Sequence, residues 1–338
     1  MAAIPLRTLG KSGLGVSALG FGSAPLGEIY ARIDERQAQE AVAAALVGGM
    51  TLLDSSPLYG HGLAEHRIGA ALRLVPTIAP VICTKVGRTV DPFAARGGES
   101  GFVGGLSHAL RFDYSYDGAM RSIEQSLLRL GVDRLDIVLI HDVDVWTHGA
   151  DAIDRRFADA VAGAYKALDR LRTDKTIAAV GVGVNEADMC VRFAQACDID
   201  CVLLAGRYTL LEQPAAAEFL PLALKRNIGV MLGGVFNSGI LATGAVAGAK
   251  YNYKPAPPDI LARVAKIDAI CKRRDVKLFD AALHFALAHP AVSSVVLGAV
   301  SAHEVAAQID SMGATIPPDL WRDLKAAGLL ASDAPVPT

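Results

Sequence analysis

The chain has 338 residues, of which 52% are hydrophobic and 20% are charged, and its formal net charge is −2. This composition predicts a large buried core rather than a disordered chain, and the charge gives no electrostatic reason to expect nucleic acid or an anionic membrane as a partner. No stretch has the apolar length of a membrane span, and the first residues lack the apolar segment of an export signal.

The predicted elements begin with a small hairpin and continue as alternating strands and helices. Two short extended pieces, 6–9 and 15–18, predict an N-terminal β-hairpin. A first buried strand follows at 18–22, and a helix runs from its N-cap Asp34 to Gly48. Further apolar runs predict strands at 52–53, 80–84, 135–140, 178–182, 201–204, 228–232 and 293–297. Helical patterns lie at 64–73, 116–130, 152–172, 186–196, 215–226, 259–273, 277–288 and 302–311.

Eight strands, most of them followed by a helix, predict an α/β protein. The strands are apolar without alternation, which indicates a sheet covered on both faces. The length allows two average domains or one large barrel, and no linker or repeat divides the chain. We therefore predict one domain over residues 1–338, a (β/α)8 TIM barrel, with an open doubly wound sheet as the alternative. The segments 87–114, 235–258 and 313–338 are too long for simple turns, and the first two follow strands, so we expect long βα loops over the active face.

The five cysteines are scattered along the chain. We interpret them as small buried residues of a protein in a reducing cytoplasm. Cys197 and Cys201 are close in sequence, but no nearby histidine or cysteine pair completes a zinc pattern, so no metal is expected.

Ionisable residues stand at the ends of three successive predicted strands. Asp54 follows one strand and Tyr59 lies five residues later, while Lys85 and His141 close the next two strands. Each residue alone has an ordinary interpretation, as a cap, a packing residue, a surface cation or a loop residue. In a barrel, however, the carboxyl ends of the strands meet at one opening, so these side chains would converge.

The four side chains have complementary chemistry. A tyrosine with its ordinary pKa of about 10 is a poor base at neutral pH. Lys85 would lower the pKa of Tyr59, and Asp54 would hold the lysine. His141 could hydrogen-bond the reacting oxygen. Such a site suits proton transfer at an alcohol or carbonyl oxygen, and a redox reaction there would need a nicotinamide. Ser55 and Ser56 have no evident base and are interpreted as turn residues.

At these residues the chain resembles the aldo-keto reductase family. The segment Asp54-Ser-Ser-Pro-Leu-Tyr-Gly-His-Gly62 is similar to the family's signature around its aspartate and tyrosine, and Lys85 and His141 match the other two members of its catalytic tetrad. The resemblance covers essentially the whole chain. It implies an NAD(P)-dependent oxidoreductase in which Asp54, Tyr59, Lys85 and His141 are catalytic.

The resemblance also implies where the cofactor would bind. Gly181–Asn185 resembles the segment that binds the carboxamide, with Val184 in place of the usual serine. Arg207-Tyr208 resembles the segment whose tyrosine stacks on the nicotinamide, with Ala205 where glutamine is customary. The stretches 233–239 and 297–301 resemble the pyrophosphate loop and the adenosine-phosphate segment. The implied cofactor-binding residues are Gly22, Ser23, Asp54, Asn185, Tyr208, Gly233, Gly234, Val235, Phe236, Asn237, Gly239, Gly298, Ser301, Glu304 and Gln308.

Val300 bears on the choice between NAD and NADP. Family members that prefer NADPH typically place an arginine there, and valine cannot make its bidentate contact with the 2′-phosphate. We therefore expect a preference for NAD, with NADP as the alternative and Lys250 as a substitute phosphate partner.

Three strings, 138–144, 183–186 and 205–213, resemble a branch of sugar 1-dehydrogenases. That branch includes L-fucose, L-galactose and D-threo-aldose dehydrogenases and a pyridoxal 4-dehydrogenase, whose shared substrate is a cyclic hemiacetal oxidised to a lactone. The resemblance implies that Tyr59 takes the hydroxyl proton of a sugar or aldehyde substrate as hydride leaves for the nicotinamide. The alternatives are an NADPH-dependent reductase of aldehydes or ketones and a non-catalytic cofactor-binding subunit.

Overall fold

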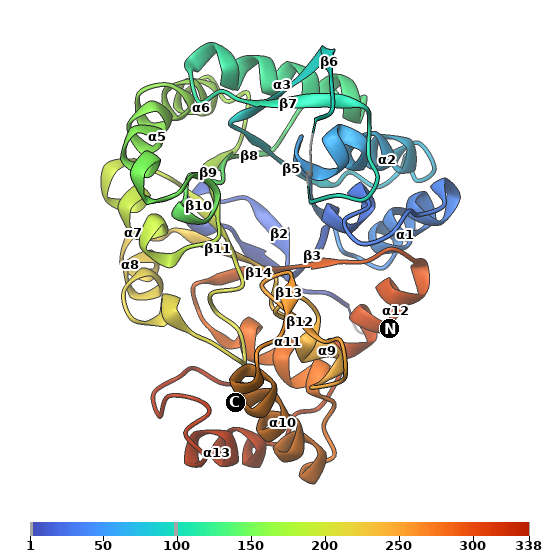
Figure 1. Cartoon of the computed structure of the whole chain (residues 1–338), viewed down its shortest axis with the longest axis vertical. Helices are drawn as coiled ribbons and strands as arrows, with labels where there is room; N and C mark the ends of the chain where they lie inside the picture. The colour runs from blue at the N-terminus through green and yellow to red at the C-terminus, as the bar shows by residue number, and fades with distance from the viewer. Residues whose placement is uncertain (1–2, 98–100, 338) are drawn as a thin grey trace.

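The computed structural model describes residues 3–97 and 101–337 of the chain. Its centre is a closed barrel of parallel strands in the order β10-β11-β14-β3-β4-β5-β8-β9 (Figure 1). Pairing of β14 with β3, at Leu297 and Phe21, completes the ring. The predicted (β/α)8 barrel is confirmed, and the open sheet is excluded. The barrel strands are β3 (Leu19–Gly22), β4 (Leu52–Asp54), β5 (Val81–Val86), β8 (Ile137–His141), β9 (Ala179–Val184), β10 (Cys201–Ala205), β11 (Gly229–Gly233) and β14 (Val292–Gly298).

Helices surround the barrel (Figure 1). Side-chain caps fix several helix starts, as where Asp34 accepts a hydrogen bond from the backbone amide of Gln37 and Ser115 accepts one from that of Gly118. The helices bury their apolar faces against the outer faces of the strands in one continuous core. They are α1 (Glu35–Val47), α2 (Leu63–Leu72), α3 (Tyr116–Leu130), α5 (Ala150–Ala162), α6 (Ala164–Thr173), α7 (Ala187–Ala196), α8 (Phe219–Arg226), α10 (Pro258–Arg273), α11 (Leu278–Ala288), α12 (Ala302–Ser311) and α13 (Pro318–Ala326), with short α4 (Val145–His148) and α9 (Ile240–Thr243).

The predicted N-terminal hairpin is formed by β1 (Leu6–Thr8) and β2 (Gly15–Ser17), which pair antiparallel. Leu9 and Val16 pack with inward-facing strand residues such as Leu139 and Met231 in a second core inside the barrel. The amide of Lys11 donates to the carbonyl of Asn227, just before β11 begins. The hairpin therefore closes the amino-terminal end of the barrel and leaves the opposite end for a site.

The helix predicted at 152–172 is two helices. Alpha helices α5 and α6 are separated at Gly163, whose backbone leaves the helical region. A Cβ at this position would lie 2.4 Å from the carbonyl oxygen of Tyr114 and 2.8 Å from the Cα of Ser115. The close approach of another segment therefore requires a glycine and breaks the helix.

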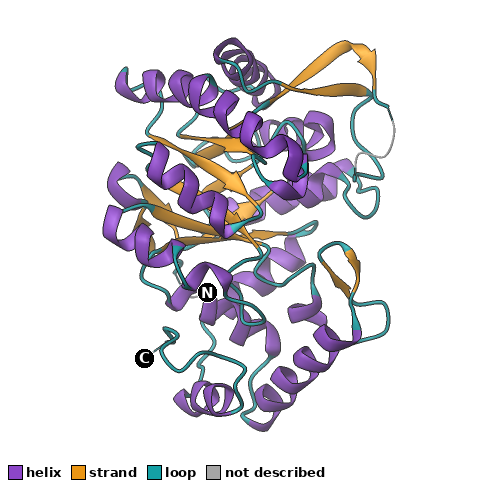
Figure 2. Cartoon of the chain, turned by 60° about the vertical axis from the view of Figure 1, so that its left-hand side comes forward, coloured by secondary structure: helices purple, strands orange, loops and turns teal. Residues whose placement is uncertain are grey.

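The segments predicted as long loops contain further structure. Residues 87–114 include an antiparallel ribbon of β6 (Arg88–Ala95) and β7 (His108–Phe112), although 98–100 lie outside the described residues. Residues 235–258 include α9 and a small hairpin of β12 (Lys250–Tyr251) and β13 (Lys254–Pro255), and the tail contains α13. Figure 2 shows the β6–β7 ribbon and the β12–β13 hairpin on the same side of the molecule. Their position after β5 and β11 agrees with the predicted long βα loops, and the structure adds that these connections contain short strands and α9.

The remaining predictions from composition concern membranes and cysteines. In the parts of the chain that the structure describes, no helix combines the length and apolar character needed to cross a membrane. All five cysteines lie within those parts, buried and with free thiols, which confirms their interpretation as small core residues. They are Cys83, Cys190, Cys197, Cys201 and Cys271.

Candidate active site

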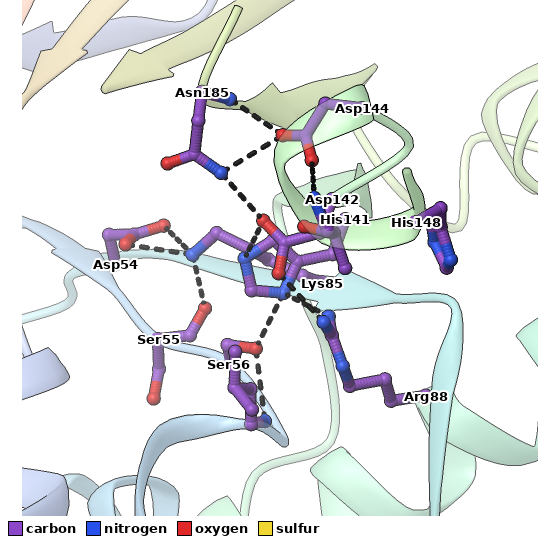
Figure 3. A network of polar contacts seen from close by, with 12 residues as sticks. Asp54, Ser55, Ser56, Lys85, Arg88, His141, Asp142, Asp144, His148 and Asn185 are labelled. Atoms are coloured by element: carbon purple, nitrogen blue, oxygen red, sulfur yellow. Dashed lines mark hydrogen bonds and ion pairs between the residues drawn. The ribbon is translucent and has the colours of Figure 1, made fainter. Parts of the chain in front are cut away.

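Lys85 is a fully buried cation at the carboxyl end of β5. Its Nζ donates to both carboxylate oxygens of Asp54, at 2.7 and 2.9 Å, and to the carbonyl of Ser55 at 2.7 Å (Figure 3). The strand continues to Val86, so Lys85 lies within it rather than at its last residue. Burial alone would lower the pKa of Lys85, but the carboxylate of Asp54 raises it above its ordinary value. The lysine is therefore held as a cation beneath the barrel mouth.

Tyr59 lies beside that cation. It opens the 3-10 turn η3 (Tyr59–Gly62), and Lys85 Nζ is 4.8 Å from the centroid of its ring. The turn passes close to Gly27, where a Cβ on Gly60 would come within 2.6 Å of the Gly27 carbonyl oxygen, so Gly60 is required for this path. Burial raises the pKa of the Tyr59 phenol and Lys85 opposes this, with a net result above the ordinary value. Lys85 lowers the pKa of Tyr59 as predicted, but burial outweighs this effect, which the sequence did not indicate.

His141 is the last residue of β8 and is also buried. Its Nδ1 lies 3.0 Å from Ser56 Oγ and 3.4 Å from Arg88 Nη1, while its Nε2 lies 3.4 Å from Asp142 Oδ1 (Figure 3). The ring meets that of Tyr59 edge-on, with centroids 6.0 Å apart. Burial, Arg88 and Lys85 together hold the pKa of His141 well below its ordinary value, so the imidazole is neutral.

A network of charges surrounds the histidine. Arg88, the first residue of β6, forms a 2.9 Å ion pair with Asp142. The side-chain nitrogen of Asn185 donates to Asp142 at 3.3 Å and to Asp144 at 2.9 Å, and the backbone amide of Asn185 also donates to Asp144 (Figure 3). Since both amide hydrogens face carboxylates, the Asn185 side-chain oxygen is turned toward the side of Asp54 and Lys85 (Figure 3).

Sequence reasoning missed four of these residues. Ser56 was interpreted as a turn residue, Arg88 lay in a segment predicted as a loop, and Asp142 and Asp144 were noticed only as part of a string. The usable signal was position, since Ser56 lies inside the signature and Asp142 follows a strand end directly. The four predicted catalytic residues do come together, which is what the strand-end argument required.

The segment after β11 forms a second side of the mouth. Gly234 has a φ of +61°, which favours glycine, and it lines a small cavity with Asn185, Gly206 and Asn237. The predicted cofactor-binding side chains Val235, Phe236 and Tyr208 do not face this cavity. Val235 is buried, Phe236 stacks on Phe279 with centroids 4.3 Å apart, and Tyr208 stacks on Phe285 with centroids 5.2 Å apart. At these positions the side chains contribute to packing, and the cofactor contacts predicted there stay predictions.

Glu212 ties this side of the mouth together. Its Oε1 accepts from Arg207 Nη1 at 3.2 Å and from Asn237 Nδ2 at 2.9 Å, and its Oε2 accepts from Tyr251 Oη at 2.8 Å. Burial and, after it, hydrogen bonding to Glu212 raise the pKa of Tyr251 to about 12. One carboxylate thus joins the segment after β10, the loop after β11 and the β12–β13 hairpin.

The predicted adenosine segment is a helix start. Ser301 caps α12 by accepting from the backbone amide of Glu304, and Glu304 Oε2 accepts from that of Val300 at 2.9 Å. Gln308 Nε2 donates to the carbonyl of Gly298 at 2.8 Å. Gly22 and Ser23, also predicted to bind the cofactor, lie at the end of the neighbouring strand β3. Gly22 pairs with both Gly298 and Asp54, and Ser23 Oγ donates to Ser55 Oγ at 2.9 Å.

Two buried side-chain amide oxygens bear on whether a nicotinamide dinucleotide fits this mouth. Asn237 Oδ1 and Gln308 Oε1 are buried, and neither has a hydrogen-bond partner among the described residues. Both are predicted cofactor-binding residues, and a nicotinamide dinucleotide carries amide, amino and hydroxyl donors from which such oxygens can accept hydrogen bonds. The residues therefore fit that group. Over 3–97 and 101–337, no group of three or more His, Cys, Asp or Glu side chains could hold a metal ion.

Comparisons with known proteins point to one family. The model described as the aldo/keto reductase family matches residues 18–328. Pyridoxal 4-dehydrogenase from Microbacterium luteolum is 40% identical, covering 96% of this chain and 98% of its own. D-threo-aldose 1-dehydrogenase from a Pseudomonas species is 34% identical, covering 94% and 96%. An aldo-keto reductase structure from Bacillus halodurans in its holo form superposes with a TM-score of 0.71 at 24% identity, covering 98% of both chains.

Proposed function

The chain belongs to the aldo/keto reductase family and is an NAD(P)-dependent oxidoreductase, and from this we propose that it oxidises a cyclic hemiacetal, an aldose or pyridoxal, to a lactone. The observation that carries the proposal is the buried Asp54–Lys85 ion pair beside the Tyr59 phenol and the neutral His141. The names of the two relatives support the substrate class, since one acts on pyridoxal and the other on D-threo-aldoses.

In the proposed reaction, each member of the tetrad has one task. Tyr59, as a phenolate, takes the proton of the substrate hydroxyl, and the charge of Lys85 beside its ring stabilises that phenolate. Asp54 holds Lys85 in place through two hydrogen bonds. His141 donates a hydrogen bond to the reacting oxygen and fixes its position. A nicotinamide held in this mouth would supply the acceptor for the hydride that leaves the same carbon.

The residues proposed to hold the cofactor lie around the mouth from β3 to β14. The oxygen of Asn185 suits the carboxamide, the backbone amides of Gly233 to Gly239 suit the pyrophosphate, and the start of α12 at Ser301 suits the adenosine end. Gly22, Ser23, Glu304 and Gln308 complete this set as predictions. The five buried thiols favour a reducing compartment such as the cytoplasm.

We propose NAD as the preferred cofactor because of Val300. The valine offers no guanidinium for a 2′-phosphate, and its amide is engaged by Glu304, whose carboxylate would repel that phosphate. Lys250, the proposed substitute partner, lies with its Nζ 4.5 Å over the ring of Tyr30. Kinetics with both cofactors test this: a kcat/KM higher with NADP by about tenfold would overturn it. The Val300→Arg variant should shift the preference toward NADP.

A reductase of aldehydes is the second candidate. The raised pKa of Tyr59 favours a protonated phenol, which is the form that donates to a carbonyl oxygen. A screen separates the two directions by following nicotinamide absorbance with NAD against L-fucose, L-galactose, D-arabinose and pyridoxal, and with NADH and NADPH against simple aldehydes. Oxidation with at least one of the first set is expected. Turnover of aldehydes alone would assign the reductase, and no turnover at all would favour a cofactor-binding subunit.

A further inference from the structure

The ring of His141 faces two hydrogen-bond donors with the same nitrogen. Arg88 Nη1 lies 3.4 Å from Nδ1, and a guanidinium can only donate. Ser56 Oγ lies 3.0 Å from Nδ1 and accepts from the backbone amide of Leu58 at 3.1 Å (Figure 3). Among the described residues, Nδ1 is the acceptor within reach of the Ser56 hydroxyl hydrogen, and with Arg88 donating to the same nitrogen we assign Ser56 as a second donor to it. Ser56 is fully buried, which removes water as a competing acceptor.

These donors have a consequence for the other ring nitrogen. A neutral imidazole has one donor and one acceptor nitrogen, and an acceptor at Nδ1 requires the hydrogen to be on Nε2. The Nε2 atom lies 3.4 Å from Asp142 Oδ1, longer than a good hydrogen bond, so its hydrogen is not strongly held by the protein. It is therefore available to an oxygen entering the mouth beside Tyr59.

We propose that Ser56, assisted by Arg88, is a positioning residue that fixes His141 in the tautomer with hydrogen on Nε2, so that the histidine donates to the reacting oxygen. The proposal deepens the proposed function, because the role of that hydrogen rests on the proposed reaction. The tautomer itself is a property of the protein alone. The wrong tautomer would present a lone pair to the hydroxyl or carbonyl oxygen and repel it.

Charged groups around the ring do not overturn this assignment. Lys85 from β5 and Arg88 from β6 are cations, Asp142 and Asp144 are carboxylates, and Tyr59 meets the ring edge-on. Burial, with the two cations, keeps the pKa of His141 well below its ordinary value. At neutral pH the open question for the ring is therefore where its single hydrogen lies, and the serine decides this.

Long-range proton–nitrogen spectra of the ¹⁵N-histidine-labelled full chain read the tautomer directly. The chain has 8 histidines, and the signals of His141 are those lost in His141→Gln. We expect hydrogen on Nε2 in the wild-type protein at pH 7. Ser56→Ala should populate the form with hydrogen on Nδ1, and Ser56→Cys, with a weak donor of similar size, should do so less. The matched control is Ser294→Ala, which removes a buried hydroxyl without a partner in the described chain and should leave the spectrum unchanged.

Turnover provides the second measurement. We expect Ser56→Ala to lower kcat about tenfold with KM for the cofactor within about twofold, as one lost hydrogen bond would. Hydrogen on Nδ1 in the wild-type protein, or Ser56→Ala and Ser56→Cys spectra identical to the wild type, would overturn the proposal. A protein with hydrogen on Nε2 that turns over no substrate would instead overturn the proposed function. If Ser56→Ala does not fold, Ser56→Cys gives the same test.

Discussion

The two sides of the barrel mouth are built differently. On the side of β4, β5 and β8, charged side chains meet in the interior, where the ammonium of Lys85 has three oxygen acceptors and Asp142 pairs with Arg88. On the side of β10, β11 and β14, glycines at 233, 234 and 298 and a helix start at Ser301 offer backbone groups, beside neutral polar side chains such as Asn237. Glu212 is the main side-chain link there and is partly exposed.

This difference separates two tasks. Burial, together with the charged groups beside them, sets the pKa values of Tyr59 and His141 before any ligand enters. The charged groups are held in place because moving them would cost the free energy of an unpaired charge. Backbone amides and glycines leave room for a large anionic ligand and permit close approach. Variants on the charged side should therefore change kcat, and variants on the backbone side should change the affinity for the cofactor.

The largest effect is expected from Tyr59→Phe. The substitution keeps the ring against Lys85 and removes only the oxygen that carries the proton. We expect kcat to fall about 10³-fold, while the Kd of the cofactor, measured by fluorescence titration, stays within about twofold. Turnover close to that of the wild type would remove Tyr59 from the mechanism. A large change in Kd would show that the two sides of the mouth are not separable.

Lys85→Met should have the next largest effect, and it should affect stability as well. The variant leaves the Asp54 carboxylate buried without its cation, which costs about 3–5 kcal/mol in the free energy of unfolding. Urea denaturation measures this loss. Adding Asp54→Asn should recover part of it, because the uncompensated charge is then gone. Recovery of stability without recovery of kcat would separate the structural role of the pair from its role beside Tyr59.

The charged side was largely predictable from the sequence. Each of Asp54, Lys85 and His141 has a side chain whose chemistry is unusual at the end of an apolar strand, and the alternation of strands and helices brings such ends together. The helix at 302–311 was also predictable to the residue, because Ser301 and Glu304 form a local capping pattern. In these cases the residue types at a few positions are enough to predict the structure.

Other features depend on contacts between distant segments. The helix break at Gly163 is caused by the close approach of the Tyr114 backbone, and the residues around Gly163 do not predict it. Arg88, which pairs with Asp142, begins the ribbon of β6 and β7. That ribbon was not predicted because Pro92 and the glycines of the segment are typical of a loop. The ring of Tyr208 stacks on Phe285 of α11, a contact with a distant segment that the residues around Tyr208 do not indicate.

On the backbone side, Glu212→Ala should weaken cofactor binding. The variant removes three hydrogen bonds that hold Arg207, Asn237 and Tyr251 together. We expect KM for the cofactor to rise about fivefold to tenfold and kcat to stay within about twofold. The control is Glu218→Ala, which removes a carboxylate from the same cavity of about 510 Å³. A fall in kcat with unchanged KM would place Glu212 with the charged side instead.

The smallest effect concerns pH in the direction of carbonyl reduction. There Tyr59 must be protonated, and burial keeps it so by raising its pKa, while His141 must be neutral, and burial with Arg88 and Lys85 keeps it so by lowering its pKa. Neither group then titrates between about pH 5.5 and pH 8, so kcat with an aldehyde should change by less than about twofold across that range. A fall in kcat centred near pH 6.5 would mean that His141 titrates as an ordinary histidine. In that event the charged side would not be fixed before the substrate binds, and the contrast between the two sides of the mouth would fail at the histidine.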